Sequence, residues 1–241
     1  KLGSVYIYLR EAALTSSHNM AGTVGRGLEL ASILDEGDRV AVDVLPRWLD
    51  LLGGTQAEAE KVLAVASLKM TKLGDSSDRA LVVSQDPPTT LEAYAAKGVA
   101  CTGADPSRVL KVRLFQDSAP VTSKYFRGMT GLEMRKVGKL EVFFTTPKND
   151  IVLFKGDEVL SKVLLPENSP TSKVSAKLIG VTNTIKRFAG MVGVRFTESE
   201  EFGPTAEKFD GTNIVGEVVG NLDAIKGLKA KDAVYLMEER S

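Results

Sequence analysis

Apolar and polar residues alternate in short segments along the second half of the chain, a pattern typical of half-buried strands. Leu110 and Leu114 belong to one such segment, and Pro120 ends it, so a helix over residues 121–129 is expected after the proline. A second short helix is expected over residues 222–227. A closed, mostly antiparallel barrel would leave no strand edge exposed. The predicted barrel strands are residues 109–115, 140–145, 151–155, 177–182, 192–196, 214–219 and 233–238.

The first half of the chain contains a helical pattern followed by two further strand patterns. Residues 54–66 predict a helix in which Thr55 is the N-cap and Glu58 completes a capping box. Residues 68–73 and 79–84 predict a β-hairpin, which a Gln-x-Pro-Pro sequence ends because proline cannot donate to a sheet. A short helix is expected next. This order resembles the PASTA module, a binding or spacing unit of bacterial kinases and penicillin-binding proteins.

Residues 19–42 repeat the apolar pattern of residues 213–236 without a gap. We therefore predict strands over residues 5–9, 20–24 and 39–44 and a helix over residues 28–34. These elements would be the closing half of a second barrel, whose opening half lies outside the chain. Half a barrel exposes strand edges, so it has to pair elsewhere, and a truncated longer protein is expected. The matched pairs include Asn19 with Asn213, Gly22 with Gly216, Val24 with Val218, Leu28 with Leu222, Leu34 with Leu228, Asp38 with Asp232 and Val40 with Val234.

These patterns predict a mainly β protein with α+β elements. Residues 1–106 are expected to form a smaller α+β region, composed of the half-barrel over residues 1–45 and the PASTA-like segment over residues 47–97. Residues 107–241 are expected to form the closed barrel.

Composition narrows the class of partner. The 241 residues contain 31 Lys plus Arg and 31 Asp plus Glu, so a neutral chain gives no reason to expect nucleic acid or a membrane surface as a partner. No apolar run reaches the roughly 18 residues of a membrane span. Cys101 is the single cysteine, which excludes an internal disulfide and suits a reducing compartment. We therefore expect a cytoplasmic protein.

Two segments of the predicted barrel resemble cyclophilins. Residues 109–131 are similar to the opening ELF-x-D-x-AP-x-T segment, and residues 209–223 are similar to the closing LDG-x-x-VVFG-x-V segment. The resemblance implies a cyclophilin-like barrel. It also implies prolyl isomerase chemistry, in which an apolar groove binds the proline and an arginine donates to the imide nitrogen.

The residues that carry this chemistry in cyclophilins are replaced. Thr146 stands where the arginine is expected, and Phe154 and Lys155 replace the glutamine and the first glycine of the same motif. The tryptophan of the groove is absent, because Trp48 lies outside the barrel. We assign no catalytic residue and lean against an enzyme, with a divergent peptidyl-prolyl isomerase as the alternative.

Several side chains remain candidates for a groove that binds a partner or a small ligand. Arg187 or Arg195 could replace the missing arginine, and no local feature selects one of them. An apolar barrel pocket for a small ligand is a further alternative. The full candidate set is Phe143, Phe144, Phe154, Arg187, Arg195, Phe202 and Asn213.

Metal chemistry has little support in the sequence. His18 is the single histidine and lies far along the chain from Cys101, and these two residues cannot supply a four-ligand zinc site or a specific Cys–His dyad. Cys101 is retained only as a ligand shared with a partner.

Several phrases together resemble the methanogenesis marker protein three family of archaea, over residues 3–239. They are VSQDPP at 83–88, LPENSP at 165–170, IGVTN at 179–183, GVRF at 193–196, EFGPT at 201–205 and FDGTNI at 209–214. Members of that family are about twice as long, so the resemblance makes the chain a C-terminal portion.

This resemblance implies a cytoplasmic accessory protein of the ATP-dependent assembly that activates methyl-coenzyme M reductase. The implied partners are the reductase, its activation factors and other methanogenesis marker proteins. Iron–sulfur clusters would be held by those partners, because one cysteine cannot hold a cluster alone.

Overall fold

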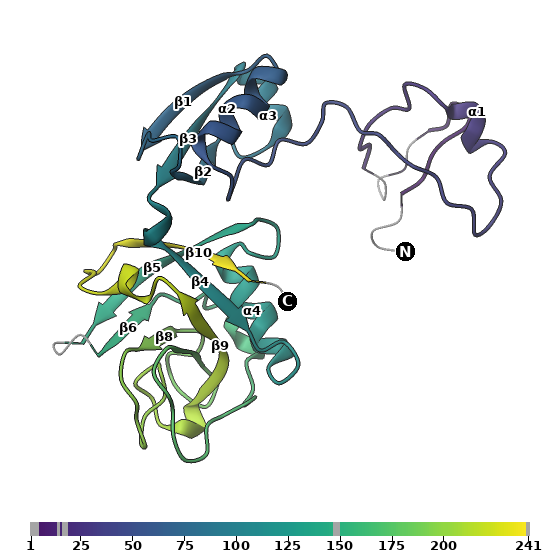
Figure 1. Ribbon diagram of the computed structural model, residues 1–241. Helices are drawn as coiled ribbons and strands as arrows, with labels where there is room; N and C mark the ends of the chain where they lie inside the picture. Colours follow the sequence, from purple (N-terminus) through teal and green to yellow (C-terminus); the bar gives the residue numbers. More distant parts are fainter. Residues whose placement is uncertain (1–4, 14, 16–18, 147–149, 240–241) are drawn as a thin grey trace. The chain divides into compact units, whose positions relative to one another are not determined.

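The computed structural model describes residues 5–13, 15, 19–146 and 150–239. They belong to two units, Lys1–Leu45 and Pro46–Ser241. The second unit contains a three-stranded sheet with helices and, further along the chain, a closed β-barrel (Figure 1). The predicted fold class, mainly β with α+β elements, is confirmed.

Within the described residues, seven short strands close the barrel. β10 runs parallel to β4, and the other neighbouring strands are antiparallel. The alternating sequence pattern therefore predicted both the closure and the strand positions. In order around the barrel the strands are β10 (Ala233–Glu238), β4 (Val109–Leu114), β9 (Thr212–Gly220), β7 (Leu178–Thr182), β8 (Val192–Arg195), β6 (Ile151–Phe154) and β5 (Val137–Thr145).

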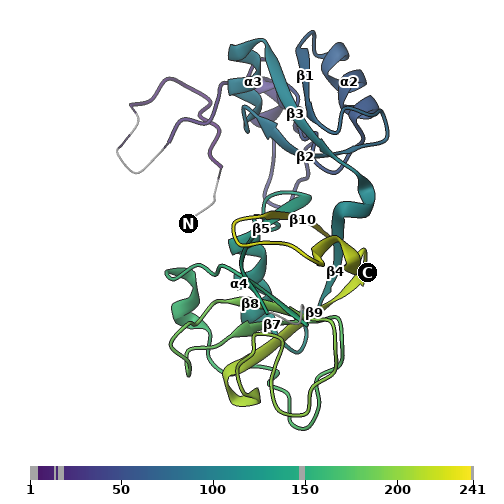
Figure 2. The ribbon, with the colours of Figure 1, turned by 90° about the vertical axis from the view of Figure 1, so that its left-hand side faces the viewer.

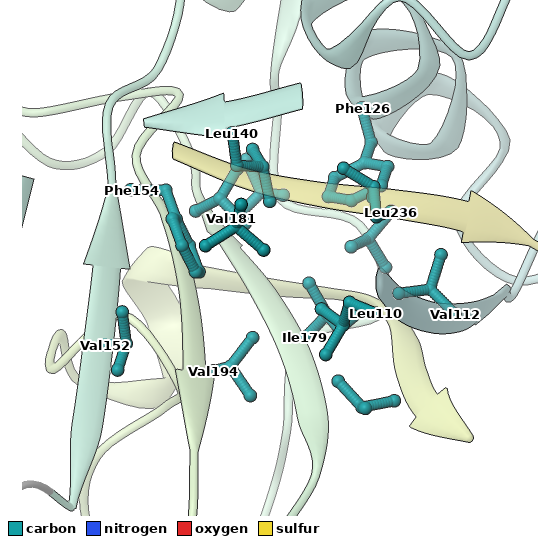
Figure 3. Close-up of a cluster of buried hydrophobic side chains, with 14 of the residues drawn as sticks. Leu110, Val112, Phe126, Leu140, Val152, Phe154, Ile179, Val181, Val194 and Leu236 are labelled. Atoms are coloured by element: carbon teal, nitrogen blue, oxygen red, sulfur yellow. The ribbon is translucent and has the colours of Figure 1, made fainter. Parts of the chain in front are cut away.

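Aliphatic and aromatic side chains from these strands fill the barrel (Figure 3). Leu110 and Val112 of β4 are buried, and Leu236 of β10 contributes to the same cluster. Phe126 joins them from the helix α4 (Pro120–Thr130), which contacts β5 and β9 (Figure 2). Each such side chain stabilises the fold by about 1.5–3 kcal/mol when it is fully removed from water.

The N-terminus of α4 is capped by a distant carboxylate. Ala119 precedes the helix and has no polar side chain, and Pro120 has no N–H. Glu167 supplies the acceptors instead: its Oε2 accepts from the Thr122 N–H at 2.8 Å and the Thr122 hydroxyl at 2.7 Å, and its Oε1 accepts from the Val121 N–H at 3.2 Å. The start of the helix is thus stabilised by a residue 45 positions further along the chain.

The amide of Asn213 completes this buried polar network. Its nitrogen donates to Thr122 Oγ1 at 3.0 Å and to the Leu165 carbonyl at 2.9 Å. Its oxygen accepts from the Glu167 N–H at 2.9 Å and from Asn183 Nδ2 at 3.1 Å. Both donor hydrogens and both acceptor positions of the amide are used, so the network joins β9, the end of β7, the 164–168 loop and α4.

The phenylalanines expected to line a groove lie on opposite sides of the barrel wall. Phe154 of β6 is completely buried in the core, whereas Phe143 and Phe144 of β5 are 51% and 48% exposed. A β-bulge separates them, since Val142 pairs with Phe154 but Phe144 pairs with Leu153. The extra residue changes the facing of the strand, so the three rings share no groove, contrary to our expectation.

The smaller sheet has a different topology from the predicted hairpin. β1 (Lys69–Gly74) and β2 (Leu81–Asp86) do not pair; β3 (Gly98–Ala104) lies between them, parallel to β1 and antiparallel to β2. The helices α2 (Gln56–Val65) and α3 (Thr90–Ala96) agree with prediction, and Thr55 and Glu58 form the capping box. The hairpin prediction is therefore wrong.

β3 was not predicted because its residues are small. Gly98, Ala100 and Gly103 have low strand propensity. Their small size lets neighbouring groups approach the strand closely. A Cβ atom on Gly103 would lie 2.0 Å from the Asp75 carbonyl oxygen and 2.5 Å from Gln56 Nε2. Only glycine fits at this position in the central strand.

A second apolar cluster joins this sheet to the barrel wall. Leu63 of α2 and Val99 of β3 are buried in it, together with Val109 of β4 and Val137 of β5. Because β4 and β5 belong to the barrel, the three-stranded sheet packs on the outside of the barrel wall. Connecting turns of 3-10 helix are η1 (Pro106–Arg108), η2 (Leu160–Val163), η3 (Phe209–Gly211) and η4 (Leu222–Ile225).

The unit Lys1–Leu45 contains the short helix α1 (Leu28–Ala31), inside the helix predicted over residues 28–34. The strands predicted over residues 5–9, 20–24 and 39–44 are not formed in the described part of this unit. Its described apolar side chains remain largely exposed. A strand forms only when its backbone pairs with a neighbouring strand, and the described part of this unit contains no such pairing.

The opposite facings of Phe154 and Phe143 predict very different costs of truncation. Phe154→Ala should lower the free energy of unfolding by about 3–5 kcal/mol, because it opens a cavity in the barrel core. Phe143→Ala, the matched control on the neighbouring strand, should cost less than about 1 kcal/mol. Urea denaturation of both variants measures the difference, and similar losses would contradict the assigned facings.

Loss of the Asn213 amide should weaken the attachment of α4. Asn213→Ala removes the acceptor of the Glu167 N–H and one of the two acceptors of Asn183 Nδ2, so we expect a loss of about 2–4 kcal/mol in unfolding free energy. A double-mutant cycle with Thr122→Ala is the control, because residues of one network couple by about 0.5–3 kcal/mol. Strictly additive losses would show that the network is not cooperative.

Candidate functional site

Thr146 occupies the position that carries the arginine in cyclophilins, and it closes a tight turn. Its Oγ1 accepts from the Asp150 N–H and the Ile151 N–H, each at 3.1 Å, and its hydroxyl is also hydrogen-bonded to the Asp150 carboxylate. The Thr146 N–H donates to the Ile151 carbonyl at 3.1 Å. The side chain therefore joins the end of β5 to the start of β6 and presents no cationic donor.

Arg195, at the end of β8, lies beside this turn. It pairs with Ile151 across the sheet and is only 7% exposed. Its Nη1 donates to the Gly203 carbonyl at 3.3 Å and its Nε to the Thr197 carbonyl at 3.4 Å, and its Nη2 lies 3.9 Å from Asp150 Oδ2. Burial lowers the pKa of the Arg195 guanidinium, and the neighbouring Asp150 carboxylate raises it. Arginine side chains are not deprotonated at neutral pH in proteins, so the group carries a positive charge.

Thr146, Asp150 and Arg195 thus form a connected polar group, here called the Thr146–Arg195 cluster. Of the two candidate arginines, Arg195 is the one joined to Thr146, through Asp150. The hydrogen bonds of Arg195 are nevertheless used on backbone carbonyls and the nearby carboxylate. An arginine that assists prolyl isomerisation has to reach the imide nitrogen of a bound peptide, and Arg195 is turned inward.

A shallow groove borders this cluster. Thr146 lines it together with Phe144 and Thr145 of β5 and the loop at residues 227–230, around a hollow of about 440 Å³. The Thr145 hydroxyl donates to the Leu228 carbonyl at 3.0 Å and fixes that loop against the strand end. Phe144 gives the groove an apolar wall and Lys229 a positive charge. Such a surface suits a peptide segment of a partner better than a small molecule that needs enclosure.

The other predicted site residues lie elsewhere in the fold. Arg187 is exposed on the loop after β7, with its guanidinium carbon 5.6 Å from the centre of the Phe188 ring. Phe202 is half-buried, and its N–H donates to Ser199 Oγ at 3.0 Å. Asn213 is buried in the polar network at α4 and is not accessible to a partner.

Sequence reasoning missed Asp150 and Glu167. Both are single carboxylates in loops, and their partners, Arg195 and Thr122, lie 45 residues away along the chain. A carboxylate in a loop carries no local signal that it is paired. The Pro-Glu-Asn-Ser-Pro sequence around Glu167 indicates a loop but does not identify the helix that Glu167 caps.

The described residues include no group of three or more His, Cys, Asp and Glu side chains placed to hold a metal ion. The Cys101 thiol is fully buried in β3, and burial raises its pKa to about 11. The thiol is therefore protonated at neutral pH and does not face a partner, as a shared ligand would. His18 lies outside the described residues. Among the described helices, none has the length and apolar character to cross a membrane.

Comparison with known proteins finds similar chains in methanogens. A UPF0288 protein of Methanothermobacter thermautotrophicus is 40% identical over 238 residues, which cover 99% of this chain and 45% of that protein. UPF0288 proteins of Methanopyrus kandleri and Methanosarcina barkeri are 38% and 36% identical, with 99% and 98% of this chain matched and 47% and 46% of theirs. The chain spans about half the length of these curated relatives.

One solved structure is weakly similar. It is the crystal structure of a conserved protein of unknown function from a locus in Enterococcus faecalis, with 14% identity and a TM-score of 0.32 over 76% of this chain and 53% of that chain. A likeness at this level carries no argument about the fold.

The barrel itself matches a known family. The match covers residues 110–239, from β4 to the residue after β10, and so includes the Thr146–Arg195 cluster and more than half of the chain. Through these residues the chain belongs to the family described as "Putative peptidyl-prolyl cis-trans isomerase domain".

Proposed function

We propose that this chain is a non-enzymatic accessory protein of methanogenic archaea, and that its cyclophilin-like barrel docks a partner instead of isomerising prolines. The observation that carries the proposal is the state of the Thr146–Arg195 cluster. Thr146 replaces the arginine of the cyclophilin motif, and Arg195 is 93% buried with its donors turned to carbonyl groups and a carboxylate. A barrel with this arrangement keeps a binding surface but lacks the donor that weakens amide resonance.

The proposed docking surface is the groove at the end of β5. Phe144 lines it beside the loop at residues 227–230, and both Phe144 and the preceding Phe143 are about half exposed. Aromatic rings at the rim of a shallow hollow are the side chains most often found as anchors in protein interfaces. The bulge that turns both rings outward thus gives the barrel an apolar contact patch in place of the missing catalytic groove.

The proposed partners are methyl-coenzyme M reductase, its ATP-dependent activation factors and other methanogenesis marker proteins. Support comes from the resemblance of segments such as EFGPT and FDGTNI to the methanogenesis marker protein three family, and from the methanogen sources of the similar UPF0288 proteins. The iron–sulfur clusters of such an assembly would belong to the partners.

The second candidate function is divergent prolyl isomerase activity, which the family description favours. It requires Arg195 to leave its bonds to Gly203 and Thr197 when a peptide binds. Arg195→Met and Arg187→Met separate the two candidates in a protease-coupled assay on an Ala-Pro peptide. We expect no acceleration by the wild-type chain; acceleration lost in Arg195→Met and kept in Arg187→Met would establish the enzyme.

Docking through the groove predicts that one aromatic ring controls capture of the partner. Immobilised chain should retain reductase subunits and activation factors from methanogen extract, as identified by mass spectrometry. Phe144→Asp should reduce this capture at least tenfold, because it places a charge in the apolar contact. Phe188→Asp is the matched control, since Phe188 is 58% exposed on a different loop. Absence of these proteins from the wild-type capture, or equal loss in both variants, would contradict the proposal.

A further inference from the structure

The short helix in the first unit has a counterpart inside the barrel. In the register that aligns residue 19 with residue 213, α1 (Leu28–Ala31) coincides with η4 (Leu222–Ile225) at both ends. The residue before each helix has a left-handed backbone, with φ of 82° at Gly27 and 60° at Asn221. The helical turn and its entry are therefore repeated in three dimensions as well as in sequence.

The turn that follows contains the same two hydrogen bonds in both copies. The Asp35 N–H donates to Asp38 Oδ2 at 2.9 Å, and the aligned Lys229 N–H donates to Asp232 Oδ2 at 2.8 Å. The Asp38 N–H donates to the Asp35 carbonyl at 3.1 Å, and the Asp232 N–H donates to the Lys229 carbonyl at 3.0 Å.

The backbone agreement does not depend on identical residues. Gly37 and Lys231 occupy the same place in the two turns, and both are left-handed, with φ of 98° and 76°. The copies differ at Gly227, which is left-handed, whereas the aligned Ile33 is not. A lysine in a left-handed backbone is uncommon, so its coincidence with Gly37 marks a shared turn and not a general property of loops.

Aligned apolar side chains are buried in the barrel copy and exposed in the first unit. In the barrel, Val234 and Leu236 of β10 point into the core and are 3% and 0% exposed. The aligned Val40 and Val42 are 53% and 72% exposed, and Val24 is likewise exposed where Val218 is buried. Large aliphatic side chains exposed at alternate positions, as at Val40 and Val42, are typical of a surface that another segment covers.

The barrel shows what covers the equivalent face. β9 pairs with β4 and β7, and β10 pairs with β4 and β5, so the neighbours come from the stretch of chain that runs from β4 to β7. More than half of the length of each relative described above lies outside the region that the chain matches. That length exceeds the stretch from β4 to β7, which is less than half of this chain.

We infer that residues 19–44 are the closing strand, turn and strand of a second barrel of the same architecture. Their apolar face is covered by a segment equivalent to β4 through β7 that belongs to the same polypeptide and lies outside this 241-residue chain. The full-length protein then carries two barrels in tandem, and the first is completed only when both parts of the polypeptide are present.

Hydrogen exchange tests this inference on the full-length polypeptide and on the 241-residue chain. Amides of residues 20–24 and 39–44 should exchange at least tenfold more slowly in the full-length polypeptide, because they become part of a sheet ladder. Equally fast exchange in both would overturn the inference. Protection that appears in the 241-residue chain and rises with its concentration would also overturn it, because a second copy would then be the covering partner.

A pair of substitutions tests the facing of the last strand. Val42→Asp in the full-length polypeptide should restore fast exchange at residues 20–24 and 39–44, because the aligned Leu236 points into the barrel core. Ala41→Asp is the matched control: the aligned Tyr235 lies on the outer side, and the next outward residue, Asp43, is already acidic. Protection in the barrel of residues 109–239 should be unchanged in both variants. Equal effects of the two substitutions would reject the assigned register.

Discussion

Every strand of the barrel pairs with a neighbouring strand on each side, and β10 completes this arrangement. That strand lies between β4 and β5, parallel to one and antiparallel to the other, and so closes a sheet that would otherwise have two free edges. Closure of the barrel fixes which side chains of each strand point into the core. On the outer surface, Val109 of β4 and Val137 of β5 pack against the smaller sheet. In the first unit, segments with the apolar pattern of strands form no sheet within the described residues.

The inner and outer faces of the barrel wall carry different sets of side chains. The interior is occupied by Phe154 and its neighbours, so no cavity for a ligand is expected within that cluster. The bulge at Phe143 leaves Phe143 and Phe144 outside, and Phe144 lines a groove together with Thr146. Arg195 holds the loop after β8 to the barrel through the carbonyls of Thr197 and Gly203.

How far the sequence predicted this fold depended on the range of the interactions concerned. Strand positions in the barrel followed from alternation of near neighbours, and the capping box of Thr55 and Glu58 from a spacing of three residues. The hairpin prediction failed because β3 consists largely of small residues whose role is close packing, as at Gly103. In the candidate site, the position of Thr146 was predictable by comparison with a motif, but its link to Asp150 and Arg195 was not. Thr146 and Asp150 meet across a four-residue turn and Arg195 joins them from a distant strand, and neither contact leaves a periodic signal in the sequence.

The cap that Glu167 provides has a consequence for the order of folding. A helix whose own N-terminus offers only Ala119 and Pro120 has little stability as an isolated segment, since nucleation is costly and the first N–H groups lack acceptors. Its stabilising carboxylate reaches it only after a loop of 45 residues has closed. In the folding transition state, α4 should therefore be among the less structured elements, and its formation should follow the pairing of the strands that bring Glu167 into place.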